Sequence, residues 1–114
     1  MTKKPEISLI ICTHQRAELL LRTLPHYTQL IPALAYELLI VLNACTDESL
    51  ENINQIKKTY GLECRVVKEE KVGLSQARNR AIKEAGTDWL VYIDDDAYPQ
   101  KDLLQRLKEI IEKC

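Results

Sequence analysis

Three consecutive carboxylates, Asp94, Asp95 and Asp96, are the residues of this sequence best suited to bind a metal ion. Like charges this close repel one another, and a divalent cation removes that penalty. Carboxylate oxygens suit Mg²⁺ or Mn²⁺, which commonly bridge one or two protein carboxylates to the phosphates of a substrate. An acidic triplet also serves as a helix cap and first-turn cluster. Because residues 89–93 before the triplet read as a buried strand, we favour the metal site.

Polar residues suited to holding a nucleotide follow two other apolar segments. Asn43 offers directional hydrogen bonds to a base or ribose, and Thr13 offers a hydroxyl to the polar edge of a ligand. Both also suit ordinary structural roles, Asn43 in a turn and Thr13 as a helix cap, and these alternatives stay open. His14 is interpreted as a solvated loop residue, because no Ser or Cys pattern frames it as a catalyst.

A glycine followed by a helix start forms a further polar segment, residues 73–79. Gly73 lets the chain approach a ligand closely, and the first turn of the helix presents free backbone amides. Arg78 and Lys71 carry positive charge that would neutralise a diphosphate, and each is equally suited to a surface salt bridge. A phosphate loop of the Walker type and a Gly-x-Gly-x-x-Gly fingerprint are both absent from the sequence.

Apolar patterns predict four strands that alternate with four helices. The strands are expected at residues 7–12, 37–42, 63–68 and 89–93, and the helices at residues 17–31, 49–60, 75–85 and 101–113. Pro25 should kink or interrupt the first helix. Asp47 and Ser75 can cap the second and third helices, and Gly61 and Gly86 should end them.

This alternation is typical of an α/β protein whose parallel sheet is covered on both faces. We therefore predict a Rossmann-like, three-layer α/β/α fold with a mainly parallel sheet of about four strands. Right-handed crossovers place the carboxyl ends of the strands at one edge of the sheet, where ligands of such folds bind. The loops at that edge are residues 13–16, 43–48, 69–74 and 94–98.

The composition describes one globular domain of 114 residues with a formal net charge of −1. This charge argues against a nucleic-acid partner. The longest apolar run, residues 38–42, is far too short for a transmembrane segment. The four cysteines show no paired spacing of the zinc-binding type. We expect reduced thiols and a cytoplasmic location, either free or peripheral at the inner membrane face.

Four of these segments, in this order, resemble the N-terminal half of family 2 glycosyltransferases with the GT-A fold. Residues 12–16, Cys-Thr-His-Gln-Arg, are similar to the Pro-Thr-Tyr-Asn-Arg motif after the family's first strand. Residues 41–47, Val-Leu-Asn-Ala-Cys-Thr-Asp, resemble its Val-Asp-Asp/Asn-Gly/Ala-Ser-Thr-Asp motif. Residues 73–79 match its Gly-x-x-x-Ala-Arg-Asn helix start, and residues 86–96 match its Gly-(Asp/Glu)-(Tyr/Trp)-apolar-Asp-x-Asp segment.

The resemblance implies transfer of a sugar from a nucleotide diphosphate sugar to an acceptor that the sequence does not name. The residues that it places at the donor nucleotide sugar are Thr13, Arg16, Asn43, Gly73, Arg78 and Asp95. Asp94 and Asp96 would form the Asp-x-Asp motif and hold Mn²⁺ or Mg²⁺, with Asp96 in direct contact. The metal would bridge the diphosphate and stabilise charge on the leaving nucleotide.

In the family, the acceptor-binding half and the catalytic base of inverting members follow the Asp-x-Asp helix. We therefore interpret residues 1–114 as a single donor-binding domain truncated before the acceptor-binding half, with no catalytic residue assigned. The alternative is a truncated, non-catalytic nucleotide-binding or interaction module. A haloacid-dehalogenase phosphatase also has a strand that ends in Asp-x-Asp, but there the motif usually starts the domain.

Truncation would also leave one strand without its later neighbour. Residues 89–93, Trp-Leu-Val-Tyr-Ile, would then expose an unpaired apolar edge, which is a template for self-association. We expect a homodimer or aggregation through this edge unless the last helix or another chain covers it.

Overall fold

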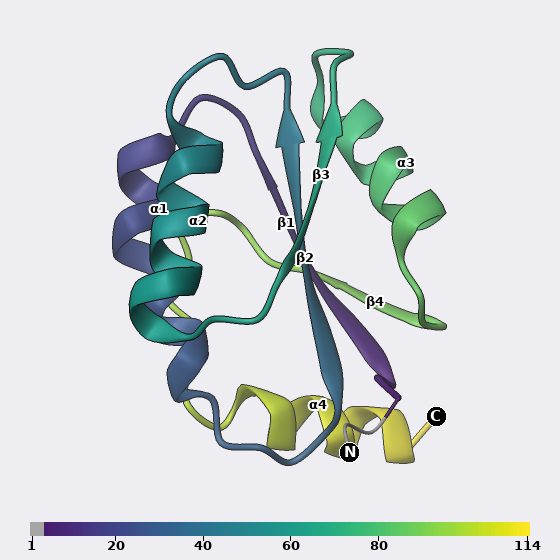
Figure 1. Ribbon diagram of the computed structural model, residues 1–114. Helices are drawn as coiled ribbons and strands as arrows, with labels where there is room; N and C mark the ends of the chain where they lie inside the picture. The colour runs from purple at the N-terminus through teal and green to yellow at the C-terminus, as the bar shows by residue number, and fades with distance from the viewer. Residues whose placement is uncertain (1–3) are drawn as a thin grey trace.

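Residues 4–114, the part of the chain that the computed structural model describes, fold around one parallel sheet of four strands (Figure 1). The first three residues of the predicted domain lie outside this range. The strands are β1 (Ile7–Thr13), β2 (Tyr36–Asn43), β3 (Arg65–Glu69) and β4 (Trp89–Tyr92). The helices are α1 (Ala17–Thr23), the 3₁₀ helix η1 (Leu24–Gln29), α2 (Ser49–Tyr60), α3 (Leu74–Glu84) and α4 (Leu103–Glu112).

The strand order is β3-β2-β1-β4, and each neighbouring pair is parallel. In the register of the sheet, Ile7 of β1 lies beside Tyr36 of β2 and Trp89 of β4. The carboxyl ends of the strands therefore meet at one edge, and the loops that follow them gather there. The predicted fold class, a three-layer α/β/α fold with a parallel sheet, is confirmed.

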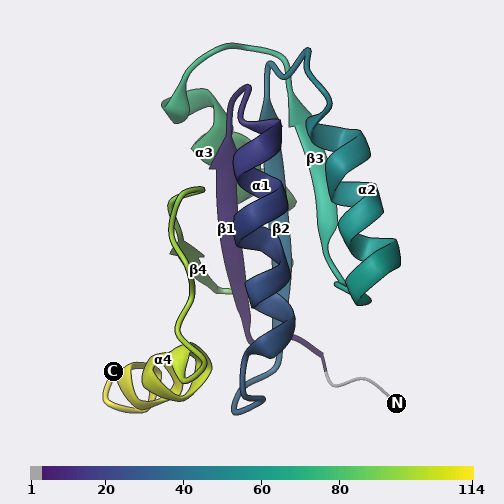
Figure 2. The same cartoon turned by 90° about the vertical axis from the view of Figure 1, so that its left-hand side faces the viewer.

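The chain reverses its direction across the sheet after β3. From β1 to β3, each new strand is added on the same side of its predecessor, whereas β4 is added on the other side of β1. Because both kinds of connection are right-handed, α1 and α2 cover one face and α3 covers the opposite face (Figures 1 and 2). Helix α4 crosses the end of the sheet at which the strands begin (Figure 1).

The hydrophobic core is divided by the sheet into two clusters of unequal size. Leu9 and Ile11 of β1 belong to the larger cluster, which also contains Leu104 of α4. Ile10 points to the opposite face, where the smaller cluster includes Ala77 of α3. This alternation follows from the period of two along a strand, and the small alanine side chain lets α3 lie close to the sheet.

Pro25 interrupts the first helix, as predicted. Helix α1 ends at Thr23, and Pro25 lies at the start of η1. Proline has no N–H to donate to the carbonyl four residues earlier, so the α-helical hydrogen-bond pattern cannot continue through it. The predicted extension to Ile31 is wrong, because this residue lies in the following loop with 55% of its surface exposed.

The two ends of α3 differ from the predictions, whereas the end of α2 agrees. Gly61 follows α2 with a left-handed φ of 72°, as expected of a glycine cap. In α3, Gly73 takes the N-cap position with no side-chain cap, so the predicted capping by Ser75 is wrong. The helix ends at Glu84 because Ala85 is already extended, one residue before the predicted stop at Gly86.

The prediction that the fourth strand is buried is also wrong. Trp89 and Tyr92 keep 41% and 39% of their surface exposed. Strand β4 lies at the edge of the sheet and, among the described residues, pairs with β1 alone. An apolar run predicts that a strand is at least partly buried, but it does not show whether the strand has one neighbour or two in the sheet.

The four cysteines stay apart in the fold. Cys12, Cys45 and Cys64 are half-buried, Cys114 is exposed, and all four are free. This agrees with the expectation of thiols rather than a disulfide framework. Among residues 4–114, no helix combines the length and the apolar character needed to cross a bilayer.

Glu37 anchors the connection between α3 and β4 to the sheet. Its Oε2 accepts hydrogen bonds from the Ser8 hydroxyl at 2.5 Å and the Gly86 amide at 2.8 Å. Its Oε1 lies 3.4 Å from the Arg65 guanidinium. Burial by itself would raise the pKa of Glu37, but these hydrogen bonds and the charge of Arg65 together hold that pKa below its ordinary value of 4.5.

We expect acid to destabilise the fold partly through Glu37. Because its pKa is lower in the folded chain, the carboxylate contributes stability above about pH 4.5, and this contribution is lost as the pH falls through the folded value. Glu37→Gln should therefore flatten the decrease in Tm between about pH 5 and pH 3. Glu18→Gln, on the exposed side of α1, controls for the loss of one surface carboxylate. An unchanged slope in Glu37→Gln would contradict this assignment.

Candidate functional site

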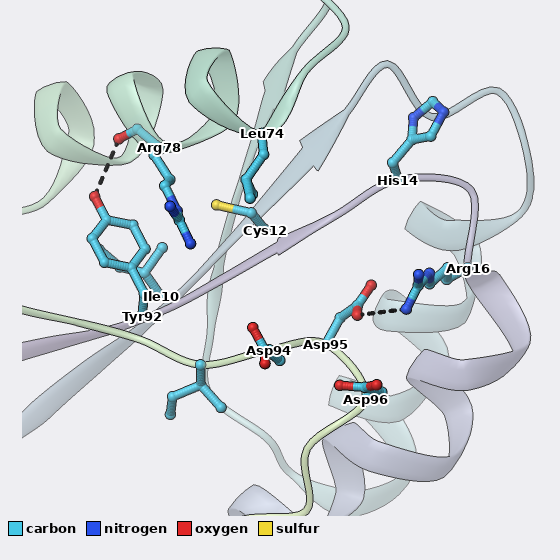
Figure 3. Close-up of a pocket in the computed structure, with 11 residues that line it drawn as sticks. Ile10, Cys12, His14, Arg16, Leu74, Arg78, Tyr92, Asp94, Asp95 and Asp96 are labelled. Atoms are coloured by element: carbon cyan, nitrogen blue, oxygen red, sulfur yellow. Dashed lines mark hydrogen bonds and ion pairs between the residues drawn. The ribbon is translucent and has the colours of Figure 1, made fainter.

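A cavity of about 410 Å³ opens at the carboxyl edge of the sheet, between β1, the end of β4 and the start of α3 (Figure 3). This is the point at which the strand order reverses, since β1 is followed by β2 on one side and flanked by β4 on the other. Open α/β sheets bind ligands in the crevice at such a point. The cavity is lined by Ile10, Cys12, His14, Arg16, Leu74, Arg78, Tyr92, Ile93, Asp94, Asp95 and Asp96.

Asp95, the middle residue of the acidic triplet, is bound by Thr13 at the end of β1 and by Arg16 at the start of α1. Its Oδ2 accepts a hydrogen bond from the Thr13 hydroxyl at 2.8 Å. Its Oδ1 accepts one from the Arg16 guanidinium at 3.0 Å, which is also an ion pair (Figure 3). Three of the predicted donor-site residues are therefore brought together, with Thr13 and Arg16 each contacting Asp95. Thr13 does not cap α1, because Arg16 occupies the N-cap position of that helix; the Thr13 hydroxyl donates to Asp95.

Asp94 and Asp96 differ from Asp95 in having no such partners. Within residues 4–114, their side chains make neither hydrogen bonds nor ion pairs, and both residues are exposed at the cavity. No group of three or more His, Cys, Asp or Glu residues in the described part of the chain is arranged to hold a metal by itself. Two carboxylates are nevertheless the usual protein share of a Mg²⁺ or Mn²⁺ site that substrate phosphates complete. The donor set fits such a shared site.

Arg78 supplies positive charge on the α3 side of the same cavity. Its guanidinium lies 5.4 Å from the centre of the Tyr92 ring, and the Tyr92 hydroxyl donates to the Arg78 carbonyl at 3.3 Å (Figure 3). Cys12 of β1 lines the same cavity. Burial raises the pKa of the Cys12 thiol, although the charge of Arg78 opposes the shift. The thiol therefore behaves as a neutral, apolar part of the cavity lining.

Asn43 does not line the cavity, because its amide group is used within the chain. Its Nδ2 donates to the carbonyls of Lys71 at 2.7 Å and Glu69 at 3.2 Å, and its Oδ1 accepts from the Gly73 amide at 2.9 Å. Gly73 has a φ of 132°, a backbone conformation that residues with a Cβ rarely adopt. Asn43 thus holds the loop that leads into α3, and a direct contact of Asn43 or Gly73 with a nucleotide stays a prediction.

His14 is part of the cavity, and its ring has a defined orientation. Its Nδ1 lies 2.6 Å from the Asn43 carbonyl, which can only accept, so Nδ1 carries the proton. In the neutral ring, Nε2 is then free to accept a hydrogen bond. The sequence interpretation as a solvated loop residue is correct about exposure but missed the proximity to the cavity.

The loops after β1 and β2 are tied together by side chains. The Gln15 Oε1 accepts from the amides of Thr46 and Asp47 at 2.9 and 3.2 Å. Asp47 in turn accepts from the Ser49 amide at 3.1 Å in the turn before α2, but the N-cap residue of that helix is Glu48, so the predicted capping by Asp47 is wrong. Gln15 and Ala44 have left-handed φ angles of 53° and 49°. These ties keep the rim of the cavity in place.

Five of the eight predicted site residues line the cavity. These are Arg16, Arg78, Asp94, Asp95 and Asp96. The residues that sequence reasoning missed are the apolar and aromatic ones, such as Cys12, Leu74 and Tyr92. One signal could have found two of them, because Cys12 and Tyr92 occupy strand positions of the same parity as Ile10 and so share its face.

A family model described as glycosyl transferase family 2 matches residues 8–114. The chain belongs to glycosyltransferase family 2. The match extends from β1 to α4, so the family membership rests on almost the whole sequence rather than on the acidic triplet alone.

Curated relatives of this family 2 chain are longer proteins. A poly(ribitol-phosphate) beta-glucosyltransferase of Bacillus spizizenii is 34% identical over 105 residues, which are 89% of this chain and 16% of the relative. The glycosyltransferase AglE of Haloferax volcanii is 30% identical over 103 residues, which are 90% of this chain and 34% of the relative. The chain thus spans about a third or less of the length of these proteins.

Solved structures show the same fold. A mannosyltransferase from Pyrobaculum calidifontis, in complex with GDP-Man and Mn²⁺, aligns with a TM-score of 0.75 at 27% identity over 90% of this chain and 31% of that one. The structure of S. aureus TarS 1–349 aligns with a TM-score of 0.80 at 22% identity over 95% of this chain and 32% of that one. The expected GT-A fold is thereby confirmed.

Ala44 offers a test of the loop geometry at the rim of the site. A left-handed φ costs a residue with a Cβ about 1 to 2 kcal/mol, whereas glycine adopts it freely but loses more entropy on folding. We expect Ala44→Gly to raise the free energy of unfolding by about 0.5 to 1 kcal/mol, measured by urea denaturation. Ala85→Gly, at a φ of −63°, is the matched control and should be destabilising. Equal losses in both variants would refute the strain at Ala44.

Proposed function

We propose that this family 2 chain binds the nucleotide diphosphate sugar that serves as donor in a metal-assisted glycosyl transfer. The observation that carries the proposal is the composition of one cavity at the reversal point of the sheet. Two exposed carboxylates without protein partners, Asp94 and Asp96, line it together with the guanidinium of Arg78. Carboxylates for a divalent cation and a cation for a diphosphate are the two charges that such a donor requires.

Asp94 and Asp96 are the residues that would hold Mn²⁺ or Mg²⁺, and the diphosphate oxygens would complete the coordination. When bound, the metal supplies charge that stabilises the departing nucleotide diphosphate. Arg78 neutralises the diphosphate from the opposite side of the cavity, and the amides at the start of α3 beside Gly73 lie next to it. Asn43 keeps that loop in place through its three hydrogen bonds. The mannosyltransferase at 27% identity, which holds GDP-Man and Mn²⁺, supports this assignment.

The proposal assigns donor binding to residues 4–114 and leaves the acceptor unnamed. The chain spans 16% and 34% of its curated relatives, and we propose that the acceptor site and the catalytic base belong to sequence that this domain does not contain. We also propose a cytoplasmic location, which suits four free cysteines. A non-catalytic binding module is the second candidate, and it shares the donor site with the first.

Calorimetric titration with UDP and GDP, each with and without Mn²⁺, tests the proposed donor site. We expect at least one nucleotide to bind only when Mn²⁺ is present, because two carboxylates hold the metal weakly without phosphate oxygens. Asp94→Asn and Asp96→Asn should each weaken that binding by about 10-fold or more. Asp88→Asn, at the exposed start of β4, is the matched control and should bind as the unmodified chain does.

The outcomes separate the candidates. Absence of nucleotide binding in a folded, unmodified chain would overturn the donor site and both candidates with it. Metal-dependent hydrolysis of a UDP or GDP sugar by the 114-residue chain would exclude the non-catalytic module.

We further propose that β4 forms a homodimer interface. The support is its position at the sheet edge and the exposure of Trp89 and Tyr92, which are 41% and 39% accessible. Light scattering should show a mass that rises from monomer towards dimer with concentration, and Trp89→Lys, at an exposed position of β4, should reduce that rise because charges on an edge strand oppose pairing with another chain. Monomers at all concentrations, with slow amide exchange along β4, would refute the interface.

A further inference from the structure

We propose that Thr13 and Arg16 are positioning residues that act through Asp95 and thereby orient Asp94 and Asp96 for the metal. The sequence interpretation instead assigned all three residues to the binding of the donor nucleotide sugar. The inference rests on the proposed metal-assisted donor site, and it assigns these side chains a different task within it.

Both oxygens of Asp95 are already occupied by protein donors. The Thr13 hydroxyl lies 2.8 Å from Oδ2, and the Arg16 guanidinium lies 3.0 Å from Oδ1. Thr13 is 3% exposed, and the Asp95 side chain is 11% exposed. A hydroxyl has only one proton to donate, and Thr13 gives it to Asp95. The Thr13 hydroxyl therefore has no proton left to donate to a nucleotide, and both oxygens of the largely buried Asp95 carboxylate already accept hydrogen bonds from the protein.

These contacts hold a part of the chain that the sheet no longer supports. The last backbone hydrogen bond between β4 and β1 runs from the Ile93 amide to the Ile10 carbonyl, at 2.8 Å. Beyond it, the triplet is joined to the end of β1 through the side chain of Asp95. Because Asp94 and Asp96 are its direct neighbours, fixing Asp95 also fixes the backbone from which they project (Figure 3).

The charges agree with this division of tasks. Arg16 neutralises one of three adjacent carboxylates, so the triplet together with Arg16 carries a net charge of −2. The two remaining negative charges belong to Asp94 and Asp96, and they match the charge of one divalent cation. Loss of Arg16 would leave the triplet with a net charge of −3. The Asp95 carboxylate could then take other orientations and compete with its neighbours for the metal.

A double-mutant cycle distinguishes action through Asp95 from direct contact with the nucleotide. Mn²⁺ affinity is measured by electron paramagnetic resonance of the free ion, with saturating UDP or GDP, in the unmodified chain, Arg16→Ala, Asp95→Ala and the double variant. We expect Arg16→Ala to weaken Mn²⁺ binding by about 3- to 10-fold in the unmodified background and to add less than about 2-fold in the Asp95→Ala background. Equal effects in both backgrounds would overturn the proposal.

A second double-mutant cycle uses no metal, so its result does not depend on whether the proposed metal-assisted function is correct. Urea unfolding of Thr13→Val, Asp95→Ala and the double variant should show a coupling of about 3-fold or more in the unfolding constant. Thr13→Ser, which retains the hydroxyl, should restore the coupling with Asp95. Thr13→Val with Asp94→Ala is the control and should show none. Absence of coupling between Thr13 and Asp95 would refute the positioning role even if Mn²⁺ does not bind.

Discussion

The right-handedness of the strand connections determines where the site lies in this fold. The chain adds β2 and β3 on one side of β1 and then places β4 on the other, so the loop after β1 leads to α1 on one face, whereas α3, which leads to β4, covers the opposite face. The crevice between them cannot be filled by either set of helices. The crevice is lined by the acidic segment that follows β4 and by a basic residue of α3, Arg78. Chain topology thus brings opposite charges to the two walls of one cavity.

Much of the fold could be predicted from local patterns, because those patterns act over a few residues. Pro25 lacks an N–H and Gly61 accepts a left-handed φ wherever they occur, so both helix ends were predictable. The start of α3 was not, because Gly73 takes its conformation from hydrogen bonds to Asn43, thirty positions earlier in the chain. The apolar run of β4 was read as a buried strand for a related reason, since strand order depends on contacts that a local run does not record; its open edge was expected only from the family resemblance.

Contacts between distant residues also limited what could be predicted about the candidate site. Residue types and spacing predicted the acidic triplet, and the structure places all three carboxylates at the cavity. They did not predict that Asp95 is bound by Thr13 and Arg16 while its neighbours have no partners. Nor did they show that the amide of Asn43 is used up by backbone groups of the loop before α3. Such partnerships depend on which loops meet in space.

The short edge strand that carries the acidic segment links ligand occupancy to local opening of the molecule. With four residues and one strand neighbour in the described sheet, β4 is held by few backbone hydrogen bonds, and such segments open at a lower free energy than the whole domain. A ligand that binds only the closed form adds its binding free energy to the cost of opening. Donor concentration would then set how often this edge is open to proteases or to a neighbouring chain. A bound donor would in this way protect the edge strand from cleavage and from pairing with another molecule.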